Sequence, residues 1–250
     1  MKKIFSMAAI ALFMMTASCS SDDSNETVNP ENGLLKKMVI TYEDGSIETD
    51  EFTYEGNKLT QITFGDGTYT KFLYNNDLLT ESQMYGTDNL IEFKNVYEYN
   101  DDNKLITDTE IHSGEGSYNK KTTFTYNSDS TITAMVYMGE GEEELHSTCI
   151  ITLTNNNITQ VHTEMAQGAV EWTMSFAYDD KNNPLKNIPA FDIITLTDFY
   201  IGGGVNNLLS QSYESEVVYT CQYQYNSNGY PSSMIDQDDI EQTTTQFIYE

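Results

Sequence analysis

Residues 51–80 read EFTYEGNKLTQITFGDGTYTKFLYNNDLLT and contain the same unit twice. Phe52 and Tyr54, and then Phe72 and Tyr74, alternate with other residues and are followed by a turn rich in Asn, Asp and Gly and by a leucine. Side chains two positions apart lie on one face of a strand. Asn, Asp and Gly favour the tight turns of hairpins. The unit therefore predicts a strand, a short turn and a returning strand.

The unit recurs along most of the chain. Its second core position falls at Tyr54, Tyr74, Tyr99, Tyr126, Leu153, Tyr178, Tyr225 and Tyr249. The spacing is 20 to 27 residues, except for one interval of 47, which we interpret as two units with one copy eroded. Such a repeat predicts an all-β fold, an antiparallel meander of stacked hairpins that forms one long curved sheet or open roll.

The long interval also contains a break in the pattern. Pro184, Pro189 and three consecutive glycines, 202–204, interrupt the hairpin rhythm, and prolines exclude a central strand. We interpret residues 182–204 as an irregular insertion, with a short helix around 192–199. An excursion from a rigid scaffold is where function is often found, so we expect a contact region at 184–204. A capping loop is the alternative.

The first 18 residues have the anatomy of a signal peptide. Two lysines precede an almost wholly apolar run, residues 4–15, which is too short for a membrane-spanning helix. The segment Thr16-Ala17-Ser18-Cys19 resembles the lipobox of bacterial lipoproteins, although Thr16 stands where that motif usually has Leu. The resemblance implies a lipoprotein that is cut before Cys19 and anchored by acyl chains such as palmitate on that cysteine. An ordinary cleavage site is the alternative.

Residues 19–33 are polar and acidic and predict a flexible tether. Serines and acidic residues directly after the cysteine resemble the surface-export signal of lipoproteins from Bacteroidota-type bacteria. That resemblance implies a location at the outer membrane or cell surface. We expect residues 34–250 to form a single domain.

The repeated unit, an aromatic-x-Tyr pair followed by a polar turn and Asn-x-Leu, resembles the tyrosine-aspartate (YD or RHS-type) repeat. The likeness covers most of residues 38–250, in the loose form found in surface lipoproteins of unknown function from Bacteroidota-type bacteria. YD repeats usually carry Gly and Arg after the turn, whereas this chain has Lys58 or Lys104 there and no arginine. The resemblance implies a repeat architecture and no particular activity.

The charge of the chain excludes several classes of partner. The formal net charge is −27, and it becomes −29 when Lys2 and Lys3 leave with the signal peptide. Nucleic acids and anionic headgroups are bound by clustered cations, so we expect neither as a partner. The lipid is the expected contact with the membrane.

Residue types that carry chemistry are sparse. The three histidines, His112, His146 and His162, lack the spacing of a zinc helix, and we expect no metal and no cofactor. Cys149 and Cys221 predict two separate buried thiols, because about three repeats separate them. Acidic clusters such as Asp101–Asp102 are expected to be solvated turns, although they leave calcium open. No catalytic residue is assigned.

Aromatic residues outside the repeat are the remaining candidates for ligand contacts. These are Trp172, Tyr200 and Tyr213. We hypothesise a non-catalytic binding or interaction module whose ligand is a glycan or a protein. The alternative is a surface or periplasmic hydrolase that uses a carboxylate pair, since an acidic chain offers many such pairs.

Overall fold

The computed structural model describes residues 33–250, apart from 115–118, 140–143, 169, 200–202 and 239. The predicted signal peptide, most of the tether, Cys19 and Tyr200 lie outside the described residues.

Sixteen strands and one helix occur in this described part of the chain. The strands are β1 (Leu35–Thr41), β2 (Ile47–Glu55), β3 (Lys58–Thr63), β4 (Tyr69–Asn75), β5 (Leu78–Tyr85), β6 (Ile91–Tyr99), β7 (Leu105–His112), β8 (Asn119–Tyr126), β9 (Thr131–Gly139), β10 (Glu144–Thr154), β11 (Asn157–Met165), β12 (Glu171–Tyr178), β13 (Leu208–Tyr213), β14 (Glu216–Tyr225), β15 (Pro231–Gln237) and β16 (Gln242–Tyr249). The helix α1 (Phe191–Thr197) lies between β12 and β13.

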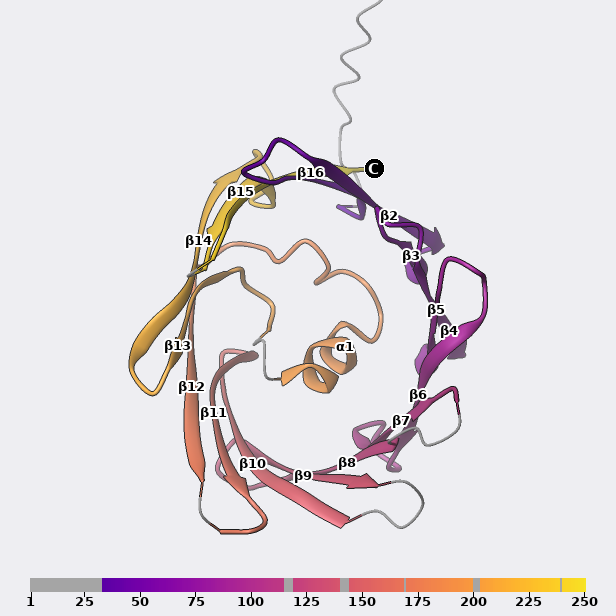
Figure 1. The fold of residues 1–250 in the computed structure, drawn as a ribbon, viewed down its shortest axis with the longest axis vertical. Coiled ribbons are helices and arrows are strands. Elements are labelled where there is room, and N and C mark those ends of the chain that lie inside the picture. Colours follow the sequence, from indigo (N-terminus) through magenta and orange to yellow (C-terminus); the bar gives the residue numbers. More distant parts are fainter. Residues whose placement is uncertain (1–32, 115–118, 140–143, 169, 200–202, 239) are drawn as a thin grey trace, which may run out of the picture.

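The sheet is a closed barrel. Each strand pairs antiparallel with the next along the chain, and β1 pairs with β16, so that the wall forms a complete ring (Figure 1). The prediction of one long curved sheet or open roll is therefore wrong, although the fold is all-β and antiparallel.

Repeated β-bulges supply a physical reason for the closure. Register shifts occur at the second core position of six units, at Tyr54, Tyr74, Tyr99, Leu153, Tyr178 and Tyr225. A bulge bends its strand and increases the local twist, and sheets are curved into barrels by such bulges. In three units a threonine occupies the bulge and donates its hydroxyl to the facing strand, as in Thr60 to the Thr53 carbonyl at 3.0 Å.

The turns between the strands have the backbone that their composition predicts. Positive φ angles occur at Gly56, Asn76, Asn103 and Asn156, each within the polar turn that follows an aromatic-x-Tyr pair or its degenerate copy. Glycine and asparagine adopt this left-handed backbone more easily than other residues.

The repeated apolar residues face the inside of the barrel. Directly paired residues share a face, and the pairing of Tyr54 with Leu59 and of Tyr74 with Leu79 puts both leucines inside, where they are fully buried. Tyr54 donates its hydroxyl to the Leu35 carbonyl at 2.7 Å and so links β2 to β1.

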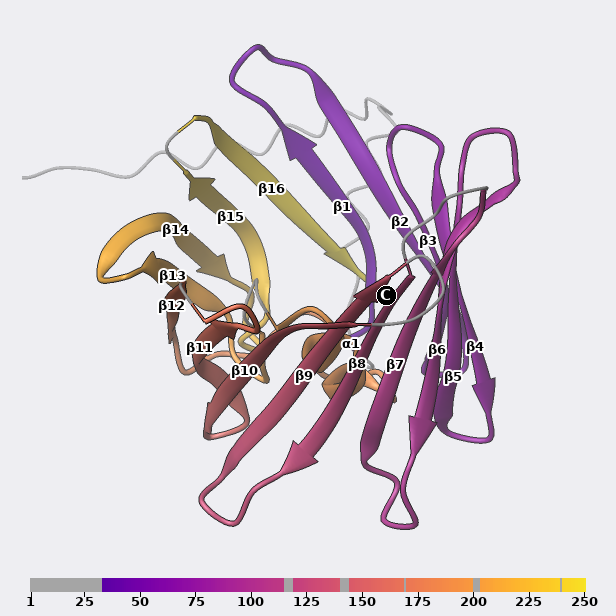
Figure 2. The same ribbon diagram turned by 60° about the horizontal axis from the view of Figure 1, so that its bottom comes forward.

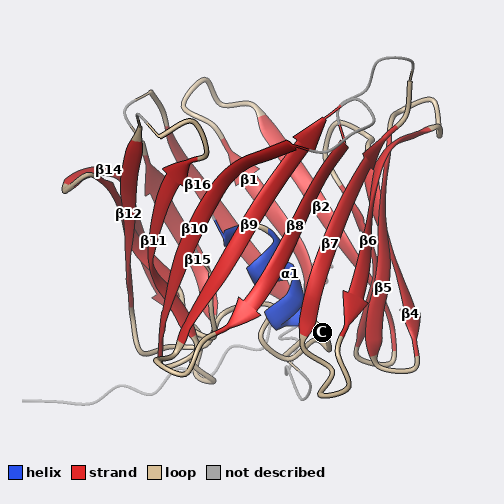
Figure 3. Ribbon diagram, turned by 90° about the horizontal axis from the view of Figure 1, so that it is seen from below, coloured by secondary structure: helices blue, strands red, loops and turns tan. Residues whose placement is uncertain are grey.

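The inserted segment runs from residue 179 to residue 207, and its described parts, 179–199 and 203–207, lie inside one end of this barrel. Helix α1 lies inside the ring in all three ribbon views (Figures 1, 2 and 3). Its buried residues Ile193 and Leu196 join the core of β5 to β12, while Ile188 joins a second core beside β1, β2 and β16. We call this the plugged end. No helix of the described residues is long and apolar enough to cross a membrane.

The insertion corrects two expectations. The 47-residue interval contains one unit, β13 and β14, plus the inserted segment, so no copy has been eroded. The segment is also no outward excursion, because its residues Ile188, Ile193 and Leu196 are buried inside the ring. The wall side chains of a 16-stranded barrel leave a central channel unfilled. The segment supplies the missing core.

The outer face of the wall is mainly polar. Cross-strand pairs on this face include Lys37 with Glu51, Gln83 with Lys94, and Thr125 with Thr133. Exposed apolar side chains such as Leu73 and Ile248 occur singly between them.

Candidate functional site

The single tryptophan of the chain faces the inside of the barrel. Trp172 on β12 pairs directly with Thr163, which is fully buried, and Met174 and Phe176 follow on the same face. Alternation along the strand thus turns the indole away from the outer surface. It lines an inner cavity of about 270 Å³.

This Trp172 cavity combines apolar and polar side chains in its wall. It lies between β8, β9, β10 and β12 and the C-terminal end of helix α1 with the two residues that follow it. Its lining residues are Lys120, Thr122, Val136, Met138, His146, Ser147, Trp172, Thr197, Asp198 and Phe199. Convergent polar groups beside apolar side chains in a concave site are a common feature of small-molecule sites.

The charged groups of the inner wall perturb one another. Burial raises the pKa of Asp198, and Lys120 opposes this effect. Burial also favours the neutral form of Glu110, but Lys120, at 3.1 Å, and His112, at 2.7 Å, more than offset it and lower the pKa of that carboxyl. Lys120 is therefore shared between the cavity and the carboxylates beside it.

Asp108 is the most buried carboxyl of this region. It lies on the inner face of β7 opposite Thr122, and only 1% of the residue is exposed. Burial raises its pKa to about 6, although Asn95 donates a hydrogen bond to the carboxyl at 2.9 Å. The inner wall thus holds two neighbouring carboxyls, Asp108 and Glu110, whose pKa values move in opposite directions.

The structure brings two of the three aromatic candidates to one wall. Tyr213 on β13 pairs with Met174, so it is a diagonal neighbour of Trp172 on the inner face, and 47% of it is exposed. Tyr200 and Cys19 lie outside the described residues. Sequence reasoning missed Lys120, His146 and Asp198, because these residues carry no motif and come from three separate segments.

A second cavity lies at the plugged end. It has a volume of about 490 Å³ and separates the inserted segment from the turn-proximal ends of β8 to β11. Its walls include Tyr126, Ile132 and Leu153 from the barrel and Ile188, Phe191 and Leu196 from the insertion. The expected contact region at 184–204 therefore borders a cavity inside the barrel.

The two internal cysteines have structural positions. Cys149 on β10 and Cys221 on β14 are both buried and form no disulfide, which confirms the prediction of two separate thiols. Thr163 donates to Cys149 Sγ at 3.4 Å. Among the acidic clusters, Asp238 accepts two backbone hydrogen bonds from Ile240 and Glu241, as expected for a turn.

Comparison with known proteins adds a family and a fold. A family model described as "Uncharacterised protein" matches residues 24–183, and no curated protein matches the chain. The crystal structure of a porin-like protein from Bacteroides uniformis ATCC 8492 has a TM-score of 0.54 at 14% identity, covering 86% of this chain and 98% of that chain. The crystal structure of TcdB2-TccC3 has a TM-score of 0.32 at 12% identity, covering 79% of this chain and 10% of that chain.

Proposed function

We propose that this chain, which belongs to the family described as "Uncharacterised protein", is an exported, lipid-anchored binding module of the outer membrane or cell surface. In this proposal the barrel stands in water and holds a ligand against its inner wall. The observation that carries the proposal is the Trp172 cavity.

The polarity of the wall supports a barrel in water. A transmembrane barrel presents an apolar band to lipid and a polar interior. Here the arrangement is reversed, because Phe, Tyr and Leu of the repeat fill the inside while Lys, Glu, Gln and Thr cover the outside. A charged side chain on the lipid face costs about 2–4 kcal/mol at the bilayer midplane. The likeness to the porin-like protein therefore extends to the fold and carries no membrane span with it.

A barrel in water needs another attachment to a membrane. The lipobox-like segment at Cys19 would provide it, and residues 19–33 would separate the lipid from β1. A single acyl chain gives marginal binding, whereas two or more chains give stable anchoring. We also propose, from the likeness of the units to YD repeats, that the barrel wall is built from repeats of this type.

A carbohydrate is the ligand that fits the Trp172 cavity best. A sugar ring offers an apolar C–H face to the indole and hydroxyl groups to Lys120, His146 and Asp198. Flat aromatic surfaces and fixed hydrogen-bonding groups together select such an amphipathic ligand. A protein ligand would instead have to contact the rim, where Tyr213 is accessible.

The test is to measure, by isothermal titration calorimetry, the binding of soluble oligosaccharides to residues 19–250 carrying Cys19→Ser. We expect Trp172→Ala to weaken binding at least tenfold, whereas Thr125→Ala on the outer face leaves it unchanged. Unaltered binding by Trp172→Ala together with loss in Ile188→Ala would move the site to the plugged end. Failure of all oligosaccharides to bind would contradict the glycan proposal.

A hydrolase is the second candidate, because one observation favours it. Asp108 and Glu110 lie two residues apart on the inner face of β7, and their environments push the two pKa values apart, as an acid/base pair requires. The burial of Asp108 keeps it from substrate in this structure, so binding ranks first. Release of reducing sugar from the same oligosaccharides, abolished by Glu110→Gln, would reverse that order.

A further inference from the structure

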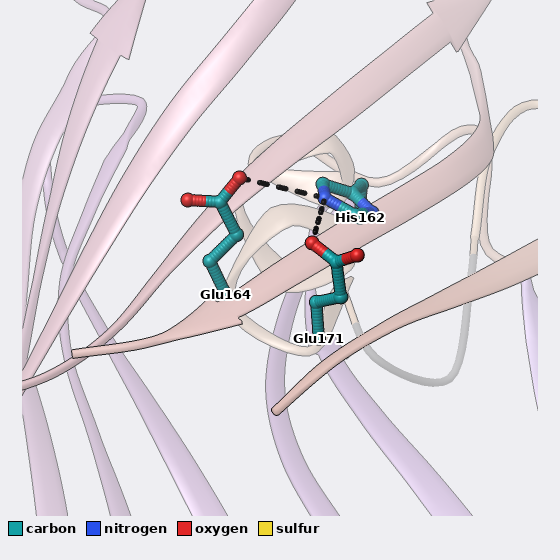
Figure 4. Close-up of side chains that lie close together, drawn as sticks. All are labelled: His162, Glu164 and Glu171. Carbon is teal, nitrogen blue, oxygen red and sulfur yellow. Dashed lines mark ion pairs between the residues drawn. The ribbon is translucent and has the colours of Figure 1, made fainter. Parts of the chain in front are cut away.

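The outer face of β11 and β12 brings together three side chains that can ligate a metal. His162 and Glu164 are two residues apart on β11, and Glu171 on β12 pairs directly with Glu164. Their ligand atoms converge on one point above the sheet (Figure 4). The register of two neighbouring strands therefore builds the cluster.

The distances are close to those of a metal site. His162 Nε2 lies 3.6 Å from Glu164 Oε1 and 3.9 Å from Glu171 Oε2, and all three ligand atoms lie within 4.8 Å of one another. Ligands that each lie about 2.0–2.2 Å from a tetrahedral Zn²⁺ are slightly closer together than this. Small rotations of the two exposed glutamates would close the difference.

A further residue orients the imidazole. Thr173 pairs with His162, and its Oγ1 lies 3.0 Å from His162 Nδ1, which directs Nε2 toward the carboxylates. An outer partner on the second ring nitrogen is the usual arrangement for a metal-binding histidine. A hollow of about 430 Å³ borders Glu164 and Glu171 and gives the remaining coordination positions access to water.

The two glutamates repel each other, and a cation between them would relieve the repulsion. Like charges directly opposite each other on neighbouring strands destabilise a sheet. The side chains of Glu164 and Glu171 are 66% and 73% exposed, so an ion can reach them from solution, and the net charge of −27 draws cations to the surface.

We propose that His162, Glu164 and Glu171 form a Zn²⁺ site on the outer wall, with Thr173 as the positioning residue and water in the open coordination positions. One imidazole with two carboxylates favours zinc over calcium, because calcium prefers an all-oxygen shell of six to eight ligands. The site lies on the opposite face of β12 from Trp172, so it is independent of the proposed ligand cavity.

The experiment is a titration of ZnCl₂ into the untagged chain, residues 19–250 with Cys19→Ser, monitored by calorimetry and by the melting temperature. We expect one Zn²⁺ per chain and a higher melting temperature with zinc. His162→Ala and Glu171→Gln should each weaken binding at least tenfold, and Thr173→Val should weaken it about tenfold through the imidazole.

The control is His112→Ala, which removes a histidine that is paired with the single carboxylate of Glu110 on the inner wall. It should leave zinc affinity unchanged. Without zinc, the melting curves of these surface variants should stay close to that of the parent chain, with Glu171→Gln slightly higher because it removes the like charge opposite Glu164. Equal affinity in His162→Ala, loss of affinity in His112→Ala, or binding of Ca²⁺ without Zn²⁺ would each overturn the proposal.

Discussion

Asp108 shows how a single residue of this barrel links stability to pH. Its carboxyl is held inside the wall by one hydrogen bond from Asn95, and burial raises its pKa to about 6. In an unfolded chain the same carboxyl has its ordinary pKa of 3.8. Above pH 6 the folded protein must therefore hold a buried negative charge, which lowers its stability.

Asp108→Asn should remove this dependence. Between about pH 4 and pH 6 the folded state binds more protons than the unfolded state, so the Asp108 contribution makes stability fall as the pH rises, by roughly 2–3 kcal/mol in total. Glu110 acts in the opposite sense below about pH 4.5, because its pKa is lowered. Urea denaturation at pH 4.5 and pH 7 measures the effect. An identical change in the parent chain and in Asp108→Asn would contradict the assignment.

Single residues also show how far the sequence could predict the site. Trp172 was identified because it stands outside the repeat, and the structure places it in a cavity. Lys120, His146 and Asp198 could not be found, since only the packing of the insertion against β8 to β10 brings Asp198 beside the other two. The Glu171 partner of His162 was missed for a related reason, because a cross-strand register leaves no spacing motif.

At the scale of elements, the turns were predictable and the bulges were not. Asn and Gly in the turns predict a left-handed backbone, and Asn76 and Gly56 adopt it. The bulges at Thr60 and Thr80 each add one unpaired residue to a strand. The sequence around them still has the composition of a strand, so the bulges are not visible in it. Because these bulges help to curve the sheet, an open roll was predicted where a barrel exists.

The inserted segment is attached by the same tyrosine position that organises the repeat. The Tyr178 hydroxyl donates to the Ile158 carbonyl at 2.7 Å and accepts from the Gly203 amide at 2.8 Å. Gly204 lies against Asn157, where a Cβ would come within 2.5 Å of the Asn157 Cα. Gly204 thus allows the insertion to pass close to the β10–β11 turn.

Tyr178→Phe should weaken this attachment. It removes the side-chain partner of the carbonyl of buried Ile158 and of the half-buried Gly203 amide, and a buried group left without a partner costs about 1–3 kcal/mol. Tyr74→Phe is the matched control, because the Tyr74 hydroxyl is buried and has no hydrogen-bond partner among the described residues. That variant should be neutral or slightly stabilising. Thermal unfolding compares the two, and an equal loss in both variants would show that the hydroxyl of Tyr178 does not hold the insertion.

At the scale of the whole molecule, the barrel has its apolar face inside. The inserted segment stabilises this arrangement, because its helix α1 gives the inward Phe, Tyr and Leu side chains a surface to pack against. Without it, a ring of 16 strands would expose an apolar lining to water. The fold of a porin-like barrel is thus compatible with a water-facing protein, provided that the channel is filled.

The attachment to a membrane should therefore depend on Cys19 alone. When the full chain is produced in a bacterium that lipidates exported proteins, Cys19→Ala should abolish labelling by a clickable palmitate analogue and release the barrel from membranes without detergent. The polar outer wall is the reason, since pairs such as Lys37 with Glu51 cannot face hydrocarbon. Trp172→Ala, which alters only the inner wall, should remain in the membrane fraction as the control. A Cys19→Ala variant that stays membrane-bound and needs detergent for extraction would show that the wall itself contacts lipid, and the water-facing barrel would have to be abandoned.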